Sequence, residues 1–454
     1  MSFISTNPAT GKIIRRFKEH TAAETERKLV DAKRAQSAWR VVPLKNRVRL
    51  AMKLAALLRK QKHELGQLMT QEMGKPIRAA IAEIEKCAWA TEYFAENAER
   101  FLSPEYVKTD ASESFISFEP LGIVLGIMPW NFPYWQVLRY AIPALLSGNA
   151  AFLKHASTVS GCALRTEELF REAGFPKGLF QVLLIETEKI PAIIADPRVS
   201  AVTLTGSERA GSIVASLAGK AVKKSILELG GSDPFIVLAD ADLAEAAHTG
   251  ARARLQNAGQ SCIAAKRFIV ARQKEKLFTK LLAARFKEMI VGDGTDEKTD
   301  VGPLSSERML RGLERQVAES VALGANVVCG GKRIDRAGYF YEPTILTHVK
   351  KGMPVYDEEV FGPVAAVIGV KDEEEAIRVA NDTPYGLGAS VWTKNLARAK
   401  RIIPRIESGS VFVNDMVKSD PRLPFGGIKQ SGYGRELSGF GLREFTNIKT
   451  VYIK

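Results

Sequence analysis

Cysteine and histidine are scarce in this sequence, and their scarcity excludes several kinds of site. The 454 residues include 4 cysteines and 5 histidines. No C-x-x-C or H-E-x-x-H pattern occurs, so we expect neither a disulfide framework nor a metal ion. Reduced thiols indicate a cytoplasmic protein. The cysteines are Cys87, Cys162, Cys262 and Cys329.

The sequence also lacks a long hydrophobic run that would serve as a membrane anchor. Residues 120–138 carry no charge, but prolines and glycines interrupt them. Both residue types argue against a membrane-spanning helix. The first residues contain no apolar segment of the signal-peptide kind. We therefore expect no membrane partner.

Long blocks of one charge sign are absent as well, although the formal net charge is +14. Basic residues alternate with acidic ones, and aromatic residues do not interleave with basic ones. A solvated surface that attracts small anions accounts for this pattern better than a nucleic-acid-binding surface does. We expect no nucleic-acid partner.

What the sequence does contain is a repeated alternation of short strands and helices. A chain of 454 residues is too long for a single core, so two or three domains are expected. Residues 21–104 show the apolar spacing of helices. From residue 121, and again after residue 230, near-continuous apolar strands alternate with helices. This alternation predicts parallel sheets that are covered on both faces.

The predicted fold class is α/β, with two doubly wound parallel-sheet domains. One domain is expected to comprise residues 1–107 and 122–229, and the second residues 230–436. The boundary between them falls near a glycine pair, Gly230 and Gly231.

A small β element is expected to complete the fold, formed by residues 108–121 and 437–454. It contains a predicted strand over 112–120 and another over 447–454. The C-terminal strand pairs either with the 112–120 strand or with a neighbouring subunit, which would hide an exposed edge. We interpret this element as an oligomerisation element of a homodimer or a homotetramer.

One cysteine differs from the other three in its sequence surroundings. Cys262 ends the segment QNAGQSC (256–262), where small and polar residues replace the aliphatic neighbours of a structural cysteine. Upstream, Glu228 lies in LELGG (227–231) beside a glycine pair. A thiol and a carboxylate next to flexible backbone suit a nucleophile and a base. An inert, buried cysteine is the alternative interpretation.

The segment LTGSERAG (204–211) runs from a predicted strand into a predicted helix. Gly206 lets the backbone approach a phosphate, Ser207 can cap the helix, and the helix N-terminus attracts an anion. No G-x-G-x-x-G occurs in the chain, and a glycine at such a place is often only a turn. Phosphate binding and a plain turn both remain open on this pattern alone.

The segment PWNFP (129–133) holds one amide side chain between prolines and aromatic residues. The two prolines stiffen the backbone on either side of Asn131. A rigidly held amide is a suitable donor to a developing oxyanion. A turn in which Asn131 bonds its own backbone is the alternative.

These motifs occur together in an order that resembles the aldehyde dehydrogenase superfamily across the whole chain. Within that superfamily the chain resembles the bacterial succinate-semialdehyde dehydrogenases. The resemblance implies NAD(P)-dependent oxidation of succinate semialdehyde to succinate, through a cysteine thiohemiacetal and a thioester. The similar segments are PWNFP, the strand at Lys154, GSERAG, ELGG, GQSC, EVFGP (359–363) and PFGGIKQSGYGRE (424–436), and for the subgroup KHAST (154–158), GCAL (161–164) and KSDPRLPFGG (418–427).

The resemblance also implies a role for each matching residue. Cys262 would be the nucleophile, and Asn131 with the Cys262 N–H would hold the oxyanion. Glu228 would be the base for thioester hydrolysis. Glu359 would hold the nicotinamide ribose, and Lys154 the adenosine ribose. The expected cofactor-binding residues are Pro129, Trp130, Lys154, Ser157, Gly206, Ser207, Gly211, Glu359 and Phe361.

Ser157 bears on the choice of cofactor. Many NAD-using relatives have Glu at this place, and its carboxylate would repel a 2′-phosphate. A serine hydroxyl leaves room for the phosphate and can donate to it, with Lys154 supplying positive charge. We therefore predict that NADP is accepted and preferred over NAD. The alternative is that Ser157 only caps the next helix.

Arg139, Gln256 and Ser419 are the expected substrate-binding residues. Arg139 lies about two helical turns beyond Asn131, and its guanidinium would clamp a carboxylate. Ser419 resembles a hydroxyl that relatives use on the same carboxylate. Several relatives have an arginine where this chain has Gln256, so a weaker clamp and a looser specificity are expected. Arg139 as a structural ion-pair partner is the alternative.

The expected small-molecule partner is therefore an aldehyde with a carboxylate. Glutarate semialdehyde or another small aldehyde is the alternative substrate. A thiol-dependent esterase is an alternative from another class, since Cys262 and Glu228 suffice for ester hydrolysis. A non-catalytic protein on the same fold is disfavoured by the joint presence of Cys262, Glu228 and Asn131.

Overall fold

Helices make up most of the first hundred residues. The computed structural model describes residues 3–454. Thr21 starts the first helix with a capping box, in which its hydroxyl accepts from the Glu24 N–H at 3.2 Å and the Glu24 carboxylate accepts from the Thr21 N–H at 2.7 Å. Pro43 and the Gly74–Pro76 break separate later helices, as the sequence predicts. The elements are β1 (Phe3–Thr6), β2 (Ile13–Phe17), α1 (Ala22–Trp39), α2 (Leu44–Lys60), α3 (Lys62–Met73) and α4 (Ile77–Leu102).

The first of two large sheets has the strand order β19-β9-β8-β5-β6-β7. Its strands are parallel except for β19, which runs antiparallel to β9. The chain moves outward from β5 to β7 and then returns to β8, so right-handed crossovers place α5 and α6 on one face and α7 and α8 on the other. The elements are β5 (Ile123–Met128), α5 (Trp135–Leu146), β6 (Ala150–His155), α6 (Ser160–Glu172), β7 (Phe180–Val182), α7 (Ile190–Ala195), β8 (Val199–Thr205), α8 (Glu208–Lys220), β9 (Lys224–Glu228) and β19 (Gly432–Tyr433).

The second large sheet has the order β12-β13-β14-β11-β10-β16-β17. It is parallel except at one edge, where β12 runs antiparallel to β13. The sequence pattern predicted that β12 runs parallel to its neighbour, and this detail was wrong. No crossover helix lies between β12 and β13 in the described chain, so the second strand returns antiparallel to the first. The strands are β10 (Pro234–Val237), β11 (Arg267–Ala271), β12 (Asn326–Cys329), β13 (Thr344–Thr347), β14 (Val364–Val370), β16 (Gly388–Trp392) and β17 (Ser410–Val413), and the helices α9 (Leu243–Leu255), α10 (Arg272–Glu288), α11 (Glu307–Ala322), α12 (Pro354–Asp357), α13 (Glu373–Asn381) and α14 (Leu396–Ile402).

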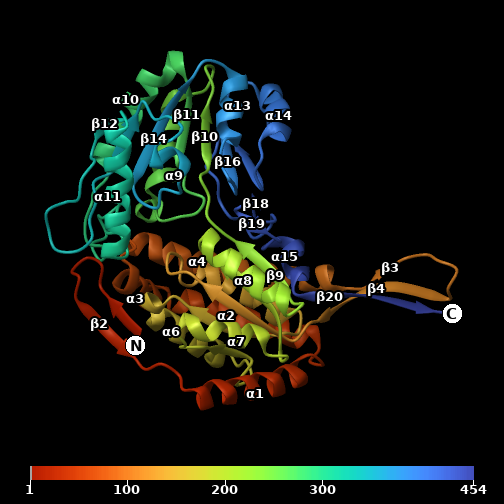
Figure 1. Ribbon diagram of the computed structural model, residues 1–454. Coiled ribbons are helices and arrows are strands. Elements are labelled where there is room, and N and C mark those ends of the chain that lie inside the picture. The colour runs from red at the N-terminus through yellow and green to blue at the C-terminus, as the bar shows by residue number, and fades with distance from the viewer. Residues whose placement is uncertain (1–2) are drawn as a thin grey trace.

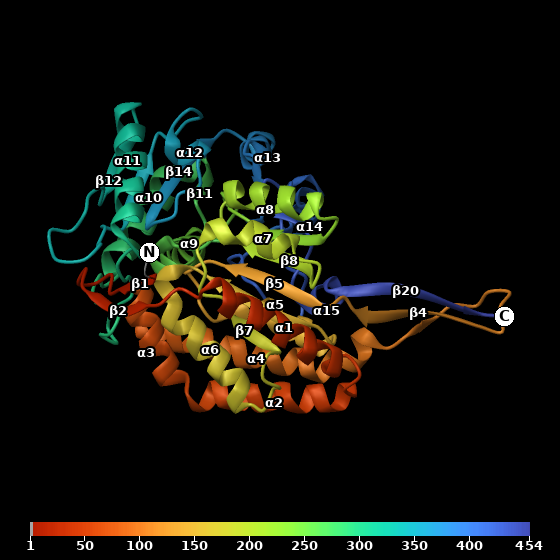
Figure 2. The ribbon, with the colours of Figure 1, turned by 60° about the horizontal axis from the view of Figure 1, so that its bottom comes forward.

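A third, antiparallel sheet with the order β20-β4-β3 extends away from both large sheets (Figures 1 and 2). Here β20 (Thr446–Ile453) pairs over its whole length with β4 (Glu113–Pro120), and β3 (Glu105–Tyr106) pairs with the other edge of β4. Pairing within the chain is one of the two outcomes expected for the C-terminal strand. We call this sheet the β20-β4-β3 arm. Several of its apolar side chains are exposed, such as Ile448 at 66%.

The α/β fold class is therefore confirmed, with two mostly parallel sheets and a small antiparallel element. One detail bears on the boundary proposed at residue 436. The chain leaves the second sheet before β19, and Gly432 of β19 lies opposite Glu228 of β9 in the first sheet. A short pair, β15 (Tyr385–Gly386) with β18 (Ile428–Lys429), precedes this return, and α15 (Ser438–Glu444) follows it. Within residues 3–454, every helix is too short or too polar to cross a bilayer.

Candidate active site

Cys262 lines a cavity of about 410 Å³ to which helices and loops of both halves of the chain contribute. The first half of the chain supplies residues of α4 and α5, such as Lys86 and Trp135. The second half supplies the connection from α9 to β11, which contains Cys262, and a segment that includes Ser419 and Phe425. The cavity therefore brings together residues that are far apart in the sequence, as a substrate site between domains requires.

The loop before Cys262 is held in an unusual backbone conformation. Asn257, Ala258 and Gly259 have φ angles of 52°, 54° and 73°. Two of the three are not glycine, and such conformations cost about 1–3 kcal/mol each unless their surroundings enforce them. Gly259 has no alternative, because a Cβ there would lie 2.1 Å from the carbonyl oxygen of Gly362.

Two buried basic side chains hold this loop conformation by bonding to its carbonyl groups. The Arg254 guanidinium donates to the carbonyls of Gly259 at 2.7 Å and Ala265 at 3.2 Å. The Lys266 ammonium donates to the carbonyls of Ser261 at 3.0 Å and Cys262 at 2.7 Å. Both cations are buried, and charge-assisted bonds to backbone carbonyls compensate their desolvation. Buried cations on either side of Cys262 in the sequence thus hold its loop in place.

The Cys262 thiol itself is half-buried. Burial raises the pKa of this thiol to about 12, and the positive charges of Lys266 and Arg139 oppose that rise. The thiol is therefore protonated at neutral pH in this state of the protein. Only a thiolate attacks a carbonyl well, so proton loss must accompany or precede attack.

Asn131 follows β5 directly and lies against the nucleophile loop. Its amide donates to the carbonyl of Gln260 at 3.0 Å, and its own backbone carbonyl accepts from the side chain of Asn257 at 2.9 Å. An amide nitrogen carries two hydrogens, so one N–H remains for a substrate oxygen. The structure thus ties Asn131 to the Cys262 loop and does not favour the alternative of an Asn that bonds its own turn.

Glu228 ends β9, and its carboxylate is 2% exposed. Neither of its side-chain oxygens has a hydrogen-bond partner in the described residues. Burial and the nearby Glu436 carboxylate raise the pKa of Glu228 well above its usual range, whereas Arg139 and Arg435 oppose the rise. A buried carboxyl without donors is rare in a purely structural role, which is consistent with a proton-transfer residue.

Arg139 is buried in α5 and forms an ion pair with Glu436. Its guanidinium also donates to the Thr205 hydroxyl at 3.3 Å and lies 5.0 Å from the centre of the Phe425 ring. Arg139 does line the cavity, but a carboxylate of the chain already occupies its guanidinium. This arrangement is the ion-pair alternative considered for Arg139, and it leaves less capacity for a substrate carboxylate.

Glu359 lies on the other side of Cys262, next to the glycine pair that follows Glu228. Its carboxylate accepts from the Gly231 N–H at 3.0 Å and lies 3.6 Å from the Lys266 ammonium. Burial raises the pKa of Glu359, and Lys266 lowers it. The neighbouring Phe361 contacts Trp130 edge-on, with ring centres 5.8 Å apart.

The remaining cofactor-binding candidates lie at the carboxyl ends of β5, β6 and β8, where parallel sheets bind dinucleotides. Ser207 caps α8 by accepting from the Ala210 N–H at 3.3 Å, so the free N–H groups of this helix face the end of β8. A Cβ at Gly211 would lie 2.5 Å from Leu229, so this glycine permits close packing of α8 on the sheet.

Lys154 and Ser157 fit the adenosine side of such a cofactor. Burial lowers the pKa of Lys154, and the only carboxylate that acts on it, Glu188, does so without an ion pair in the described residues. Ser157 is exposed and makes no capping bond to its own 3₁₀ turn, which begins after Ala156. The helix-cap alternative for Ser157 therefore has no support, and both polar groups have room for a ligand.

Lys86 of α4 is a cavity residue that the sequence did not point to. Its ammonium donates to the Ser419 hydroxyl at 2.7 Å and lies 4.3 Å from the centre of the Trp135 ring. Gln256 lines the same cavity and is partly exposed. Ser419, Gln256 and Lys86 thus line the same cavity as Cys262.

Sequence reasoning missed a set of buried charged residues around the site because nothing local marks them. Glu436 belongs to a quoted motif, yet its pairing with Arg139 depends on the return of the chain to the first sheet. A charged residue within an apolar strand start, as in AAKRFIV, is the one signal that was available for Lys266. The buried residues concerned are Arg254, Lys266, Arg267 and Glu436, and the half-buried Lys86 was missed for the same reason.

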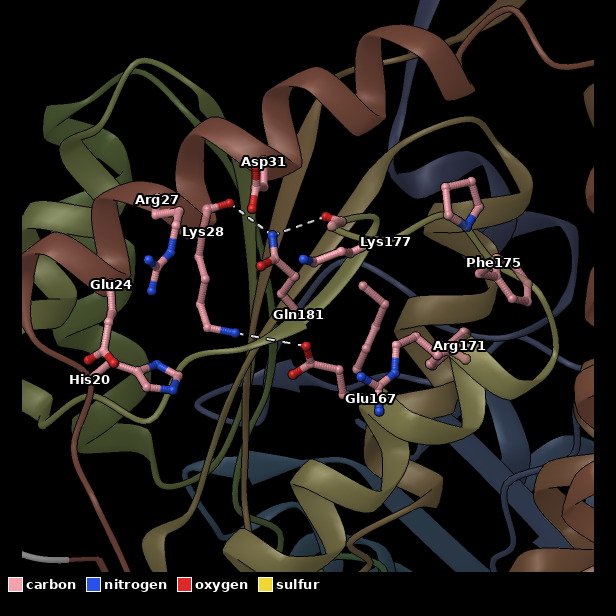
Figure 3. A pocket seen from close by; sticks show the side chains of 14 residues that line it. His20, Glu24, Arg27, Lys28, Asp31, Glu167, Arg171, Phe175, Lys177 and Gln181 are labelled. Carbon is pink, nitrogen blue, oxygen red and sulfur yellow. Dashed lines mark hydrogen bonds and ion pairs between the residues drawn. The ribbon is translucent and has the colours of Figure 1, made fainter.

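A second hollow of about 410 Å³ lies between α1 and the α6–β7 region, away from the residues described above (Figure 3). The Gln181 amide donates there to the carbonyls of Lys28 and Gly178, at 2.8 and 3.1 Å, and Lys28 lies 3.8 Å from Glu167. Its acidic and basic side chains are mixed, and it contains no cysteine. No group of His, Cys, Asp and Glu in residues 3–454 is placed to hold a metal ion.

Comparisons with known proteins agree with this geometry. A family model for the aldehyde dehydrogenase family matches residues 1–451. A probable NADP(+) succinate-semialdehyde dehydrogenase of Synechocystis sp. is 49% identical over 453 residues, covering 100% of both chains. NADP(+) succinate-semialdehyde dehydrogenase 1 of Mycobacterium tuberculosis is 48% identical over 456 residues, again covering 100% of both. The crystal structure of succinic semialdehyde dehydrogenase from Streptococcus pyogenes with NADP+ has a TM-score of 0.97, 39% identity and 99% coverage of each chain.

Proposed function

This chain belongs to the aldehyde dehydrogenase family, and we propose that it oxidises succinate semialdehyde to succinate with NADP. The observation that carries the proposal is one cavity lined by Cys262 and by the Lys86–Ser419 pair. The Asn131 amide is bonded to the loop that precedes Cys262. Relatives with names of this activity align over their full length at 47–49% identity. An aldehyde carbon at the thiol and a carboxylate at the cationic end fit this arrangement.

The first step joins the Cys262 sulfur to the aldehyde carbon, and the thiol proton leaves to solvent or to a nearby base. The carbonyl oxygen becomes an oxyanion that the free N–H of Asn131 and the Cys262 N–H are positioned to stabilise. Because these donors act on charge that develops only as the bond forms, they lower the barrier more than they strengthen substrate binding. A bound nicotinamide would supply the hydride acceptor, and loss of hydride from the adduct would leave Cys262 as a thioester.

Glu228 acts as the base in the hydrolysis of the thioester. Water attacks the thioester carbon, a proton passes to the Glu228 carboxylate, and the carbon–sulfur bond breaks to release succinate and restore the thiol. The raised pKa of Glu228 suits this role, because the ionised carboxylate is then a stronger base than an ordinary one and takes the proton more readily in the transition state. Gly426 leaves space for the acid, since a Cβ there would lie 2.8 Å from its oxygen.

The proposed cofactor contacts follow the ends of the first sheet. Ser207 and the N-terminus of α8 would bind the pyrophosphate, and Glu359 the nicotinamide ribose. Lys154 and the exposed Ser157 hydroxyl would bind the adenosine ribose with its 2′-phosphate. A 2′-phosphate meets no carboxylate at position 157, which supports NADP over NAD.

One experiment distinguishes the proposed substrate and cofactor from the alternatives. Purified protein is assayed for reduced nicotinamide absorbance with succinate semialdehyde, glutarate semialdehyde and butanal, each with NADP and with NAD. The proposal requires the highest kcat/KM for succinate semialdehyde with NADP. Higher kcat/KM with NAD would overturn the cofactor preference, and higher kcat/KM with another aldehyde would overturn the substrate.

The esterase alternative has a separate test. A p-nitrophenyl ester that turns over without cofactor, in a protein that oxidises none of the aldehydes, would replace the proposed function. The sequence alone also leads us to propose a cytoplasmic homo-oligomer, in which the β20-β4-β3 arm packs on a partner. Multi-angle light scattering of the whole chain and of a variant that ends before β20 tests that assembly.

A further inference from the structure

We propose that Lys86, together with Ser419, binds the carboxylate of the aldehyde substrate and thereby sets its selectivity. The inference rests on the proposed function for its substrate. It replaces Arg139, the residue that the sequence favours for this role. The observation behind it is a desolvated ammonium in the same cavity as the nucleophile, with a hydroxyl as its polar partner.

Lys86 is oriented by α4 toward the cavity. Its Nζ atom lies 2.7 Å from the Ser419 Oγ and 4.3 Å from the centre of the Trp135 ring. The ring face attracts the cation and shields it from water. Lys86 is therefore held between α5 and the segment that carries Ser419, with its charge at the edge of the space in which a substrate must lie.

No carboxylate of the described chain lies within ion-pair distance of Lys86. The nearest acids that act on it, Glu83 and Asp420, each have another partner. Glu83 is paired with Lys75 and accepts from the Tyr134 and Trp135 N–H groups at 3.1 and 3.0 Å. Asp420 is paired with Arg422 at 2.7 Å.

A partly desolvated ammonium without a counter-ion is costly, and an arriving anion removes that cost. The Ser419 Oγ accepts from Lys86, so its own O–H remains free to donate. Two donors, one of them charged, can then converge on one carboxylate. This pair offers a physical reason why Gln256 suffices where relatives have an arginine.

The other cations of the cavity are less suited to the role. Arg139 is paired with Glu436, Lys75 with Glu83, and Lys418 with Asp415. Arg252, one helical turn before Gln256, has no ion pair within residues 3–454, but it is exposed. Solvent and salt screen an exposed charge, so we expect Arg252 to attract the substrate weakly and Lys86 to bind it.

The ionisation of Lys86 gives the role a distinctive pH signature. Burial lowers its pKa to about 8, with Arg139 acting in the same direction and Cys87, Glu83 and Asp420 in the opposite one. The ammonium is charged below this pKa and neutral above it. The affinity for a carboxylate should therefore fall as the pH rises past about 8, whereas the affinity for an uncharged aldehyde should not follow this course.

The kinetic experiment compares Lys86→Met, Lys86→Arg and Arg252→Gln with the unaltered enzyme. We expect Lys86→Met to lower the ratio of kcat/KM for succinate semialdehyde to that for butanal by about 10- to 100-fold, as the loss of a charged hydrogen bond implies. Lys86→Arg should retain most of the ratio and remove the rise of KM above pH 8, because a guanidinium stays charged. Arg252→Gln should change the ratio little.

A binding experiment makes the test independent of turnover. Succinate should slow the alkylation of Cys262 by iodoacetamide, followed by mass spectrometry, in the unaltered protein and in Lys86→Arg, and should not slow it in Lys86→Met. An equal loss of kcat/KM with both aldehydes in Lys86→Met, or protection by succinate that survives in it, would overturn the role of Lys86. Absence of any aldehyde oxidation while Lys86-dependent protection persists would instead overturn the proposed function alone.

Discussion

Glu228 and Glu359 are two acids of the same type in different surroundings: Glu228 is buried at the end of β9, and Glu359 is half-buried beside Lys266. Glu359 accepts from the Gly231 N–H and lies 3.6 Å from Lys266. Glu228 has no hydrogen-bond donor, and the nearest strong cation, Arg139, is already paired with Glu436. Burial raises the pKa of both acids, but only Glu359 has groups in direct contact that favour its anion.

The difference teaches how one chain obtains two functions from one side chain. A carboxylate with a fixed donor and a nearby ammonium keeps its charge and is suited to hold a ligand hydroxyl. A carboxyl without donors changes its protonation state easily and is suited to move protons. The neighbours, and not the residue type, thus separate a binding acid from a proton-transfer acid.

The largest effect is expected when the group that both acids serve is removed. Cys262→Ala should lower aldehyde oxidation by at least about 10⁴-fold, as the loss of a covalent nucleophile does. Reduced nicotinamide formation measures the loss. Cys329→Ala is the matched control, since that thiol lies in β12 outside the cavity and its removal should leave the rate unchanged. Undiminished oxidation by Cys262→Ala would remove the basis for the roles of both acids.

Replacing each acid by its amide should separate the two roles. Glu228→Gln should slow steady-state turnover by about 10²- to 10⁴-fold through loss of the base, yet a rapid first turnover should still produce one reduced nicotinamide per site. Glu359→Gln should instead slow that first turnover and raise the KM for NADP. Stopped-flow absorbance distinguishes the two patterns. Identical traces from both variants would mean that the contrast in neighbours has no functional meaning.

Removing Arg139 tests the buried ion pair that it forms with Glu436 near Glu228. Arg139→Met leaves Glu436 buried without its partner, so we expect the free energy of unfolding to fall by about 3–5 kcal/mol. The double variant Arg139→Met with Glu436→Leu should recover most of that loss. Urea unfolding followed by circular dichroism measures both. A stable single variant with a raised KM for succinate semialdehyde would restore Arg139 as the substrate clamp.

The smallest effect is expected from making the two acids more alike. Lys266→Met removes the charge that favours both the Glu359 anion and the Cys262 thiolate. Since the thiol pKa of about 12 lies above the assay range, alkylation by iodoacetamide should rise with pH. The variant should react about tenfold more slowly at a given pH, the effect of one pKa unit. Lys266→Arg keeps the charge and should react much like the unaltered protein.

Much of the framework was predictable from local patterns. Apolar runs such as GIVLGIM and VAAVIGV predicted buried parallel strands, and β5 and β14 confirm them. The short β9 was not predicted, because Lys224–Glu228 contains only two apolar residues, Ile226 and Leu227, and was interpreted only as the motif around Glu228. The antiparallel direction of β12 was not predicted either, because a hydrophobic pattern does not give the direction of a strand.

Site residues could be predicted from the sequence only where they lie within short, recognisable motifs. Cys262, Glu228 and Asn131 stand in short motifs with a recognisable composition. The structure bonds Asn131 to the loop before Cys262 and buries Glu228 at the end of β9. Lys86 stands in an ordinary amphipathic helix, and only the packing of α4 against α5 and the Ser419 segment brings it into the cavity. The pairing of Arg139 depends likewise on the return of β19 to the first sheet.

The sequence by itself determined the α/β architecture and the family and marked Cys262 as the candidate nucleophile, because these follow from residue order and local periodicity. The tertiary structure alone decided which charges are neutralised, since a Coulomb interaction depends on distance and burial and not on separation along the chain. It is this second kind of information that makes Arg139 a partner of Glu436 and leaves Lys86 available to a substrate.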